Sequence, residues 1–289
     1  MLMRAPIPNY LGGGSWMGIE APWTNLGELR NTGFEITLNT IPVSTGDWNW
    51  SSDLIFSRNI NKVISLGAES LLVDQNVQWF HHVTRTAEGM PVGQFYGYIV
   101  EGIFQNSTDI ENHATQNDKV SRFSGVWPGD LKFKDISGPE GVPDGQVDAT
   151  YDRTFIGDPY PAFTFGWTNT VRFKNFDFTL FLQGTYGNKI YNFTRRNTEG
   201  MTGVFSNYLN TVSNRANLVS DDPEADPDDV AAWYVSNSGT DMPRAIITDP
   251  NDNRRVSTRY VEDGSYLRIK NVMIGYSLPN SVLGKIKAR

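Results

Sequence analysis

Two runs of residues, 163–173 and 176–186, alternate apolar and polar side chains and are joined only by Lys174 and Asn175. Because side chains of an extended chain point alternately to its two sides, this pattern places the apolar members on one face of a sheet. A two-residue connection between such runs indicates a β-hairpin. The apolar members are Phe163, Phe165, Trp167, Val171 and Phe173, followed by Phe176, Phe178, Leu180, Leu182 and Tyr186. The segment therefore predicts two long antiparallel strands with one apolar and one polar face.

An earlier segment, 33–57, carries the same pattern in two runs around a turn at Thr45 and Gly46. Its alternating apolar members are Phe34, Ile36, Leu38, Trp48, Trp50, Leu54 and Phe56. Polar residues occupy most of the positions between them. We therefore expect a second two-faced hairpin here.

The remaining segments are less regular. Residues 1–31 are rich in Gly and Pro and are expected to form a loop. Extended structure is expected at 92–104, near Leu131–Asp135 and at 259–277, although the alternation at 92–104 is poor. Helix is expected only as a turn or two, at 230–233 and 280–287.

Composition narrows the classes of protein that this chain can represent. The absence of cysteine excludes disulfide scaffolds, thiolate zinc sites and cysteine nucleophiles, and no apolar run approaches the roughly 18 residues of a membrane helix. A formal net charge of -7 with only 3 histidines argues against a nucleic-acid partner. Aromatic residues reach 12% although apolar residues reach only 39%. This mixture is typical of alternating β-strands with long polar loops.

Two β-architectures satisfy the alternation, and the period alone does not separate them. In a soluble sandwich the apolar face packs inward, whereas in a transmembrane barrel it meets lipid. Strands of about 9–11 residues match the hydrocarbon thickness when tilted, and short turns alternating with long loops are typical of outer-membrane barrels. Aromatic residues such as Trp48, Trp167 and Tyr186 lie near strand ends, where barrels carry aromatic girdles. These features favour the barrel, and a soluble β-sandwich glycan-binding module is the alternative.

Several blocks, in order along the chain, resemble one known family. They are 31–35 (NTGFE), 93–98 (GQFYGY) with 102–105 (GIFQ), 128–135 (PGDLKFKD), 153–159 (RTFIGDP), 181–188 (FLQGTYGN) and 259–271 (RYVEDGSYLRIKN). From about Asn31 to the end, the chain is similar to the C-terminal barrel half of SusC/RagA-type TonB-dependent outer-membrane transporters. The resemblance implies an all-β fold, an antiparallel transmembrane β-barrel of which this chain is a part. Transporters with 22 strands and a plugged lumen are one class of such barrels.

The resemblance also implies transport and not catalysis. It implies energised import of oligosaccharides or peptides, a SusD-like surface lipoprotein as a lid, and coupling to the inner-membrane TonB complex. It places the chain in the outer membrane, in contact with lipid. No spacing of nucleophile, base and carboxylate indicates an enzyme, so we expect no catalytic residues, and no motif identifies the residues that bind substrate.

We expect residues 1–289 to be part of a transporter barrel domain. The family's signal, TonB box and plug have no counterpart, so contact with TonB is expected through that missing N-terminal part. Because 22 strands of about 9–11 residues need over about 200 residues before loops are added, the chain should supply roughly six to ten strands. Residues 1–8 lack a signal-peptide pattern and 283–289 end on a basic stretch. We interpret the chain as an internal fragment; a complete cytosolic protein is the alternative.

Four aspartates, Asp135, Asp144, Asp148 and Asp152, look like a split calcium-binding loop. Hard oxygen ligands at alternate positions around a Gly turn suit Ca²⁺, and family members commonly carry a compact loop of this kind here. The insertion of 139–143 disrupts the ligand spacing, so a solvated loop of Asx turns is the alternative. Ca²⁺ is the only cofactor that the sequence suggests.

The long polar segments 59–91, 105–162 and 187–257 are expected to be mostly extracellular or to face the lumen, where they would contact substrate or the lid lipoprotein. One of them contains an acidic run, 221–229, that we interpret as a solvated loop. The short connections at 174–175 and 278–284 are expected to be periplasmic turns.

Overall fold

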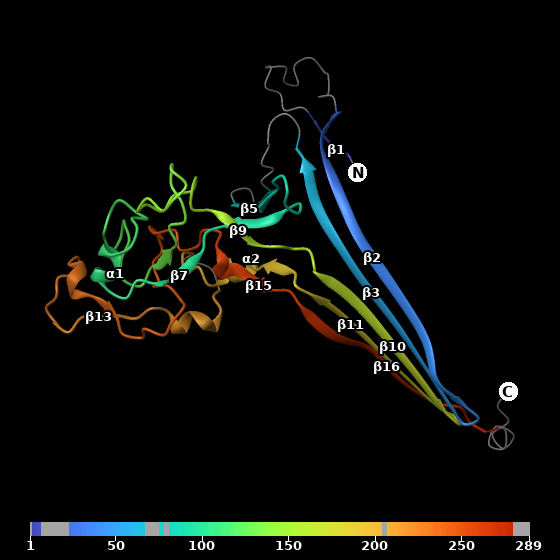
Figure 1. Cartoon of the computed structure of the whole chain (residues 1–289). Coiled ribbons are helices and arrows are strands. Elements are labelled where there is room, and N and C mark those ends of the chain that lie inside the picture. The colour runs from blue at the N-terminus through green and yellow to red at the C-terminus, as the bar shows by residue number, and fades with distance from the viewer. Residues whose placement is uncertain (1, 7–22, 67–74, 78–80, 204–206, 280–289) are drawn as a thin grey trace, which may run out of the picture.

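The computed structural model describes residues 2–6, 23–66, 75–77, 81–203 and 207–279. They form a long, curved antiparallel sheet and a compact lobe that projects from one side of it (Figure 1). The sheet has six strands in the order β1-β2-β3-β10-β11-β16. Their bounds are Leu2–Pro6 (β1), Trp23–Thr45 (β2), Trp48–Ser65 (β3), Phe163–Phe173 (β10), Phe176–Tyr186 (β11) and Tyr266–Tyr276 (β16).

The hairpin predicted from the strictest alternation is confirmed. β10 and β11 pair residue for residue over their whole lengths. Lys174 turns the chain with a φ of 52°, and its N–H donates to the Asp47 carbonyl at 2.9 Å. The N–H of Ser277 donates to the Asn175 carbonyl at 2.8 Å. The two short turns and the end of β16 therefore lie together at one end of the sheet (Figure 1).

Two expectations near the N-terminal side of the sheet are wrong. Residues 1–31 are not all loop, because β1 lies within them and β2 begins at Trp23. Residues 59–65, expected to begin a loop, complete β3. A Cβ at Gly27 or Gly33 would come within 2.2 Å or 2.3 Å of a carbonyl oxygen of β3, so these glycines allow close strand approach and do not form turns. Pairing with a neighbouring strand overrides the local loop signal.

The connections between the sheet strands fold into the lobe, away from the short turns (Figure 1). Its strands are β4 (Gln75–Val77), β5 (His81–Arg85), β6 (Gln94–Gly97), β7 (Val100–Ile103), β8 (Leu131–Phe133), β9 (Thr154–Gly157), β12 (Lys189–Tyr191), β13 (Leu218–Val219), β14 (Tyr234–Val235) and β15 (Val261–Asp263). Its helices are α1 (Ser107–Glu111) and α2 (Phe193–Thr198), with short 3-10 turns at Asn210–Asn214, Val230–Ala232 and Thr258–Tyr260. Among the described residues, no helix has the length and apolar content of a membrane span.

The weaker sequence predictions in the lobe have mixed outcomes. The extended segments at 92–104 and near residue 131 are confirmed as β6, β7 and β8, and the turn at 230–233 is confirmed as a 3-10 turn. The single long strand expected at 259–277 is wrong in its first part, where a 3-10 turn and β15 precede β16. The helical turn expected at 280–287 lies outside the described residues.

The packed interior of the described chain lies in the lobe. Its largest fully buried side chains include Trp127, Tyr260, Phe104 and Phe133, and the guanidinium of Arg255 lies 4.2 Å from the ring centre of Phe133. In contrast, the strands of the sheet are joined mainly by backbone pairing, and many of their apolar side chains remain exposed. The chain therefore combines a two-faced sheet with a self-contained globular lobe.

Candidate functional site

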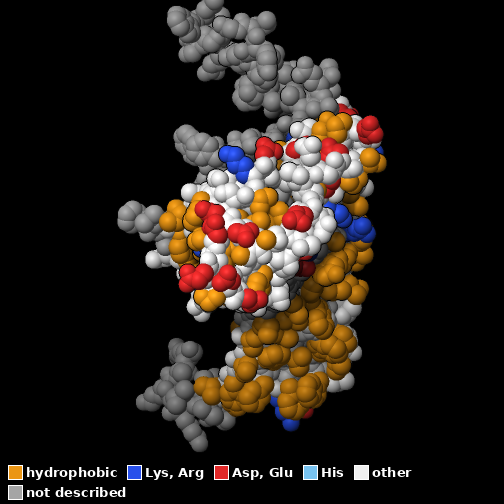
Figure 2. Space-filling view, turned by 90° about the vertical axis from the view of Figure 1, so that its left-hand side faces the viewer, with side chains coloured by type: hydrophobic (Ala, Val, Ile, Leu, Met, Phe, Trp, Pro, Cys, Tyr) orange, Lys and Arg blue, Asp and Glu red, His pale blue; other side chains and the backbone are white. Residues whose placement is uncertain are grey.

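One face of the six-stranded sheet carries apolar side chains that stay exposed in the described chain. Leu38 of β2 pairs with Leu54 of β3, which in turn pairs with Trp167 of β10. The apolar residues of neighbouring strands therefore lie side by side and form one surface. Ile36 is 52% exposed and Ile274 is 75% exposed. Figure 2 shows hydrophobic side chains gathered over the sheet below the lobe. A continuous apolar surface of this kind marks contact with another apolar phase or with a partner.

Aromatic side chains border this apolar face at both ends. The ring pairs are Trp48–Phe173 and Phe176–Tyr276 near the short turns, and Phe56–Phe163 and Phe163–Tyr186 near the lobe. From one belt to the other β10 rises about 33 Å, at about 3.3 Å per residue, and a tilt of about 40° reduces this to about 25 Å. That is the height of the apolar band of outer-membrane barrels. Trp48 and Tyr186, predicted at strand ends, therefore lie in belts with the spacing of a membrane-crossing band, whereas Trp167, also predicted near a strand end, lies in the middle of β10.

Two polar residues, Ser52 and Asn169, interrupt the apolar face midway between the belts and pair directly across β3 and β10. Trp167 Nε1 donates to Ser52 Oγ at 2.8 Å, and Trp50 Nε1 donates to Asn169 Oδ1 at 3.1 Å. Each indole N–H thus finds an acceptor oxygen, which reduces the cost of placing these polar groups against an apolar phase. From the sequence, Ser52 and Asn169 are recognised only as polar residues that break the apolar alternation, and their hydrogen bonds to tryptophan are not predicted.

The opposite face of the sheet is polar and contains a hollow of about 300 Å³. Its lining includes Asp53, Ile55, Thr164, Thr168, Phe181, Gln183 and Lys270. The register between β11 and β16 shifts after Phe181 and leaves Lys270 without a direct partner, and Lys270 Nζ donates to Gln183 Oε1 at 3.1 Å. Such a bulge redirects a side chain. Periodicity predicts the polar face but not this hollow, because the bulge has no signature in the pattern.

A buried ion pair in the lobe joins Asp130 to Arg244, whose side chains are 0% and 5% exposed. Arg244 Nε donates to Asp130 Oδ1 at 2.7 Å, and Arg244 Nη2 donates to Oδ2 at 2.9 Å. Asn253 Nδ2 and the Trp127 N–H also donate to this carboxylate, each at 2.9 Å. Burial raises the pKa of the Asp130 carboxyl, and the hydrogen bonds and charge of Arg244 oppose that rise. The pair fastens together two parts of the lobe that are distant in sequence.

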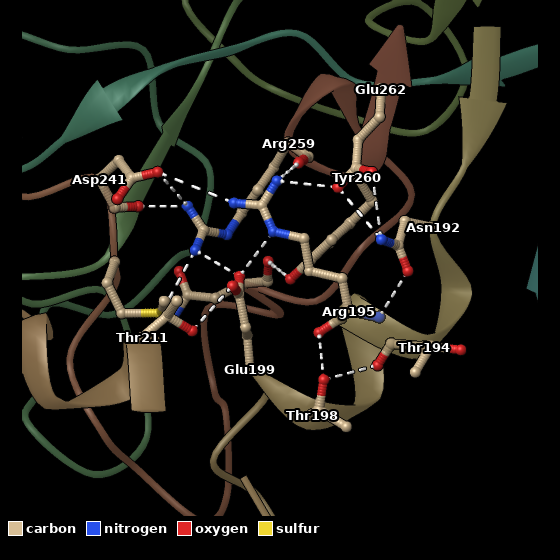
Figure 3. A network of polar contacts seen from close by, with 12 residues as sticks. Asn192, Thr194, Arg195, Thr198, Glu199, Thr211, Asp241, Arg259, Tyr260 and Glu262 are labelled. Atoms are coloured by element: carbon tan, nitrogen blue, oxygen red, sulfur yellow. Dashed lines mark hydrogen bonds and ion pairs between the residues drawn. The ribbon is translucent and has the colours of Figure 1, made fainter. Parts of the chain in front are cut away.

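A second polar network ties α2 to the segment that leads into β16 (Figure 3). Glu199 Oε2 accepts from Arg195 Nε and from Arg259 Nη2, both at 3.0 Å. Glu199 Oε1 accepts from Thr211 Oγ1 at 3.1 Å, and Arg195 Nη1 donates to Glu262 Oε1 at 3.4 Å. The side chains of Glu199 and Arg259 are 3% and 4% exposed. This network of paired charges, with Glu199 and Arg259 buried at its centre, lies where the chain leaves the lobe and enters the sheet.

The four aspartates of the predicted calcium loop accept hydrogen bonds from backbone N–H groups. Asp152 is fully buried and accepts from Ile136, Ser137 and Asp148. The other three accept within the same loop: Asp135 from Gly145, Asp144 from Gln146, and Asp148 from Thr150 and Tyr151. In the part of the chain that the structure describes, no three His, Asp or Glu side chains gather so that they could hold a metal ion. The contacts fit the Asx-turn alternative, and the calcium site stays a prediction.

Replacing Asp152 by alanine is expected to destabilise the lobe by about 3 kcal/mol, because three backbone N–H groups lose a charged acceptor. Hydrogen exchange of the lobe amides measures this loss. The matched control is Asp118→Ala, at an exposed position, which should change protection by less than about 0.5 kcal/mol. If the aspartates act only as caps, adding Ca²⁺ or a chelator leaves wild-type protection unchanged. A strong rise in protection with Ca²⁺ would establish the metal site instead.

Relatives are found over nearly the whole chain. The TonB-dependent receptor P3 of Formosa agariphila is 35% identical over 99% of this chain, which covers 25% of that relative. SusC of Bacteroides thetaiotaomicron, also a TonB-dependent receptor, is 24% identical over 89% of this chain and 21% of its own length. The chain is a homologue of the TonB-dependent receptors. No protein-family profile matches it.

Solved structures of the RagAB peptide importer show the same fold. The RagAB peptide importer in its open-open state matches 98% of this chain with a TM-score of 0.64 and 21% identity, and the chain covers 25% of that structure. The RagAB peptide transporter matches 98% with a TM-score of 0.62 and 22% identity. The partial, all-β antiparallel barrel fold predicted for this TonB-dependent receptor homologue is therefore confirmed. The chain spans about a quarter of the length of the curated relatives it matches.

Proposed function

We propose that this chain forms part of the barrel wall, together with an outer lobe, of a SusC/RagA-type transporter in the outer membrane. The transporter imports oligosaccharides or peptides, works with a SusD-like surface lipoprotein, and draws energy from the TonB complex through parts outside this chain. Its function is passage of substrate and not chemistry. Residues 1–289 act as one portion of a barrel domain that other strands complete.

The observation that carries this proposal is the exposed apolar face bounded by two aromatic belts. Hydrocarbon stabilises such a face, whereas water does not. The sheet also ends on β1 and β16, and unpaired strand edges are not tolerated in a bilayer. Further strands on both edges would satisfy those backbone groups. The homology to TonB-dependent receptors supports the same arrangement.

The position of the lobe supports its orientation. Short turns in outer-membrane barrels face the periplasm and long connections face outward. The lobe lies away from the short turns (Figure 1), so it would sit on the outer side, where substrate and the lipoprotein arrive. RagAB is described as a peptide importer, which supports import without fixing the substrate of this chain.

No observation favours the soluble β-sandwich module. A sandwich needs a second sheet packed on the apolar face. In the described residues, the other sheets are the small two-stranded and four-stranded sheets of the lobe, and the apolar face of the main sheet remains exposed.

Fractionation and uptake test the proposal together. The complete gene product that carries this chain should appear in the outer-membrane fraction and require detergent for extraction. Uptake of its labelled substrate should fall to background when that gene or the TonB complex is inactivated. Recovery of the native product in the soluble fraction without detergent would overturn the proposal.

A further inference from the structure

A hollow of about 300 Å³ lies in the lobe beside β13, which Figure 1 places at the far end of the lobe from the sheet. Three arginines line it: Arg122, Arg215 and Arg244. Its other lining residues include the exposed Phe123 and Asn217. No acidic side chain is among the described residues that line it. The hollow therefore combines positive charge with an aromatic ring and an amide.

Two of these arginines carry uncompensated charge. The charge of Arg244 is balanced by its buried ion pair with Asp130. In the described chain, by contrast, no carboxylate forms an ion pair with Arg122 or Arg215. The acidic run 221–229 does not supply one either. Two arginines that line one hollow without an ion-paired carboxylate favour an anionic ligand there.

The backbones of Arg122 and Arg215 accept hydrogen bonds from other parts of the lobe. Arg244 Nη1 donates to the Arg122 carbonyl at 2.6 Å, and the Arg122 guanidinium lies 5.1 Å from the ring centre of Trp233. Asn237 Nδ2 donates to the Arg215 carbonyl at 3.0 Å. Because their backbones are fixed, less conformational freedom remains to be lost when a ligand binds. The buried Asp130–Arg244 pair thus provides a rigid floor for the hollow.

We propose that this hollow binds the carboxylate or sulfate group of an acidic oligosaccharide. Guanidinium groups bind such planar or tetrahedral oxyanions through paired charge-assisted hydrogen bonds. Phe123, which is 64% exposed, offers an apolar ring for the C–H face of a sugar, and the Asn217 amide offers a donor and an acceptor for its hydroxyls. The proposal names the substrate class of the proposed importer, and so it rests on that function.

Binding to the purified, complete gene product in a non-ionic detergent tests the site without requiring transport. The probes are tetragalacturonate, a sulfated carrageenan tetrasaccharide, the neutral cellotetraose and a tetra-glutamate peptide, measured by isothermal titration calorimetry. We expect one or both acidic saccharides to bind, with affinity that falls as salt is raised. Cellotetraose should bind at least about tenfold more weakly, since it lacks the charge-assisted contacts.

Single variants assign the binding to this hollow. Arg215→Gln and Arg122→Gln should each weaken binding of the acidic saccharide by at least about tenfold. Lys134→Gln is the matched control, because it removes an exposed cation that does not line the hollow, and it should change affinity by less than about twofold. Arg215 is exposed, so its variant keeps the test valid if Arg122→Gln disturbs folding.

The outcomes separate this site from the proposed function. Equal binding of cellotetraose, binding of the acidic peptide alone, or an unchanged affinity in Arg215→Gln would each overturn the site. TonB-dependent uptake of a neutral glycan with no binding of acidic ones would leave the transporter intact and reject the site. Binding of the acidic saccharide by a product that shows no uptake would support the site and reject the transport role.

Discussion

Replacing Leu180 by arginine is expected to destabilise the proposed barrel by about 2–4 kcal/mol, because the new charge would lie at the middle of the apolar face that we propose meets lipid. Leu180 pairs with Asn169 and Val272 across its two neighbouring strands and lies midway between the two aromatic belts. The complete gene product should accumulate less in the outer membrane. After refolding into lipid vesicles, urea unfolding followed by tryptophan fluorescence should give the free-energy difference.

The matched control is Thr179→Arg, one residue away on the polar face of the same strand. On that face the new guanidinium meets water or polar groups, so the loss of unfolding free energy should stay below about 1 kcal/mol. Equal losses for Thr179→Arg and Leu180→Arg would contradict the assignment of the two faces. If neither substitution changed the free energy of unfolding, the sheet would not cross a bilayer.

Replacing Arg244 by methionine is expected to destabilise the lobe by about 3–5 kcal/mol, because Asp130 would remain buried without its counter-charge. The lobe should open locally while the sheet stays paired, since the two parts are held by different interactions. Limited proteolysis of the detergent-solubilised product across a urea series should show early cleavage in the lobe. The control is Lys189→Met, which removes the exposed pair with Asp263, and its loss should stay below about 1 kcal/mol.

The defect of Arg244→Met should also depend on pH. Burial raises the pKa of Asp130 above its ordinary value, and the variant loses Arg244, whose positive charge opposes that rise. A carboxyl whose folded pKa lies above its unfolded pKa destabilises the fold at high pH, and this effect is relieved as pH falls through the folded pKa. The variant should therefore recover stability relative to wild type as pH is lowered. A defect that grows on acidification would show that Asp130 is not the group left uncompensated.

Alternation determined the central strands of the sheet from sequence alone. The runs 163–173 and 176–186 set their own faces and their own register, because a two-residue turn leaves one way to pair them. The same local pattern placed Trp48 and Tyr186 at strand ends, and the sequence blocks indicated homology to the TonB-dependent receptors. These features need only residues that are near one another along the chain.

The tertiary structure alone decided the features that depend on distant residues. Residues 23–31 belong to β2, although they look like loop, because β1 pairs with residues 23–28 and β3 pairs with residues 28–31. Asp130 and Arg244 are 114 positions apart, and the sequence around each residue does not predict that they pair. Arg244 also lines the hollow with Arg122 and Arg215, which are likewise distant from one another in sequence. Period and turn chemistry act over a few residues, whereas burial, ion pairing and concave sites arise only when remote segments pack together.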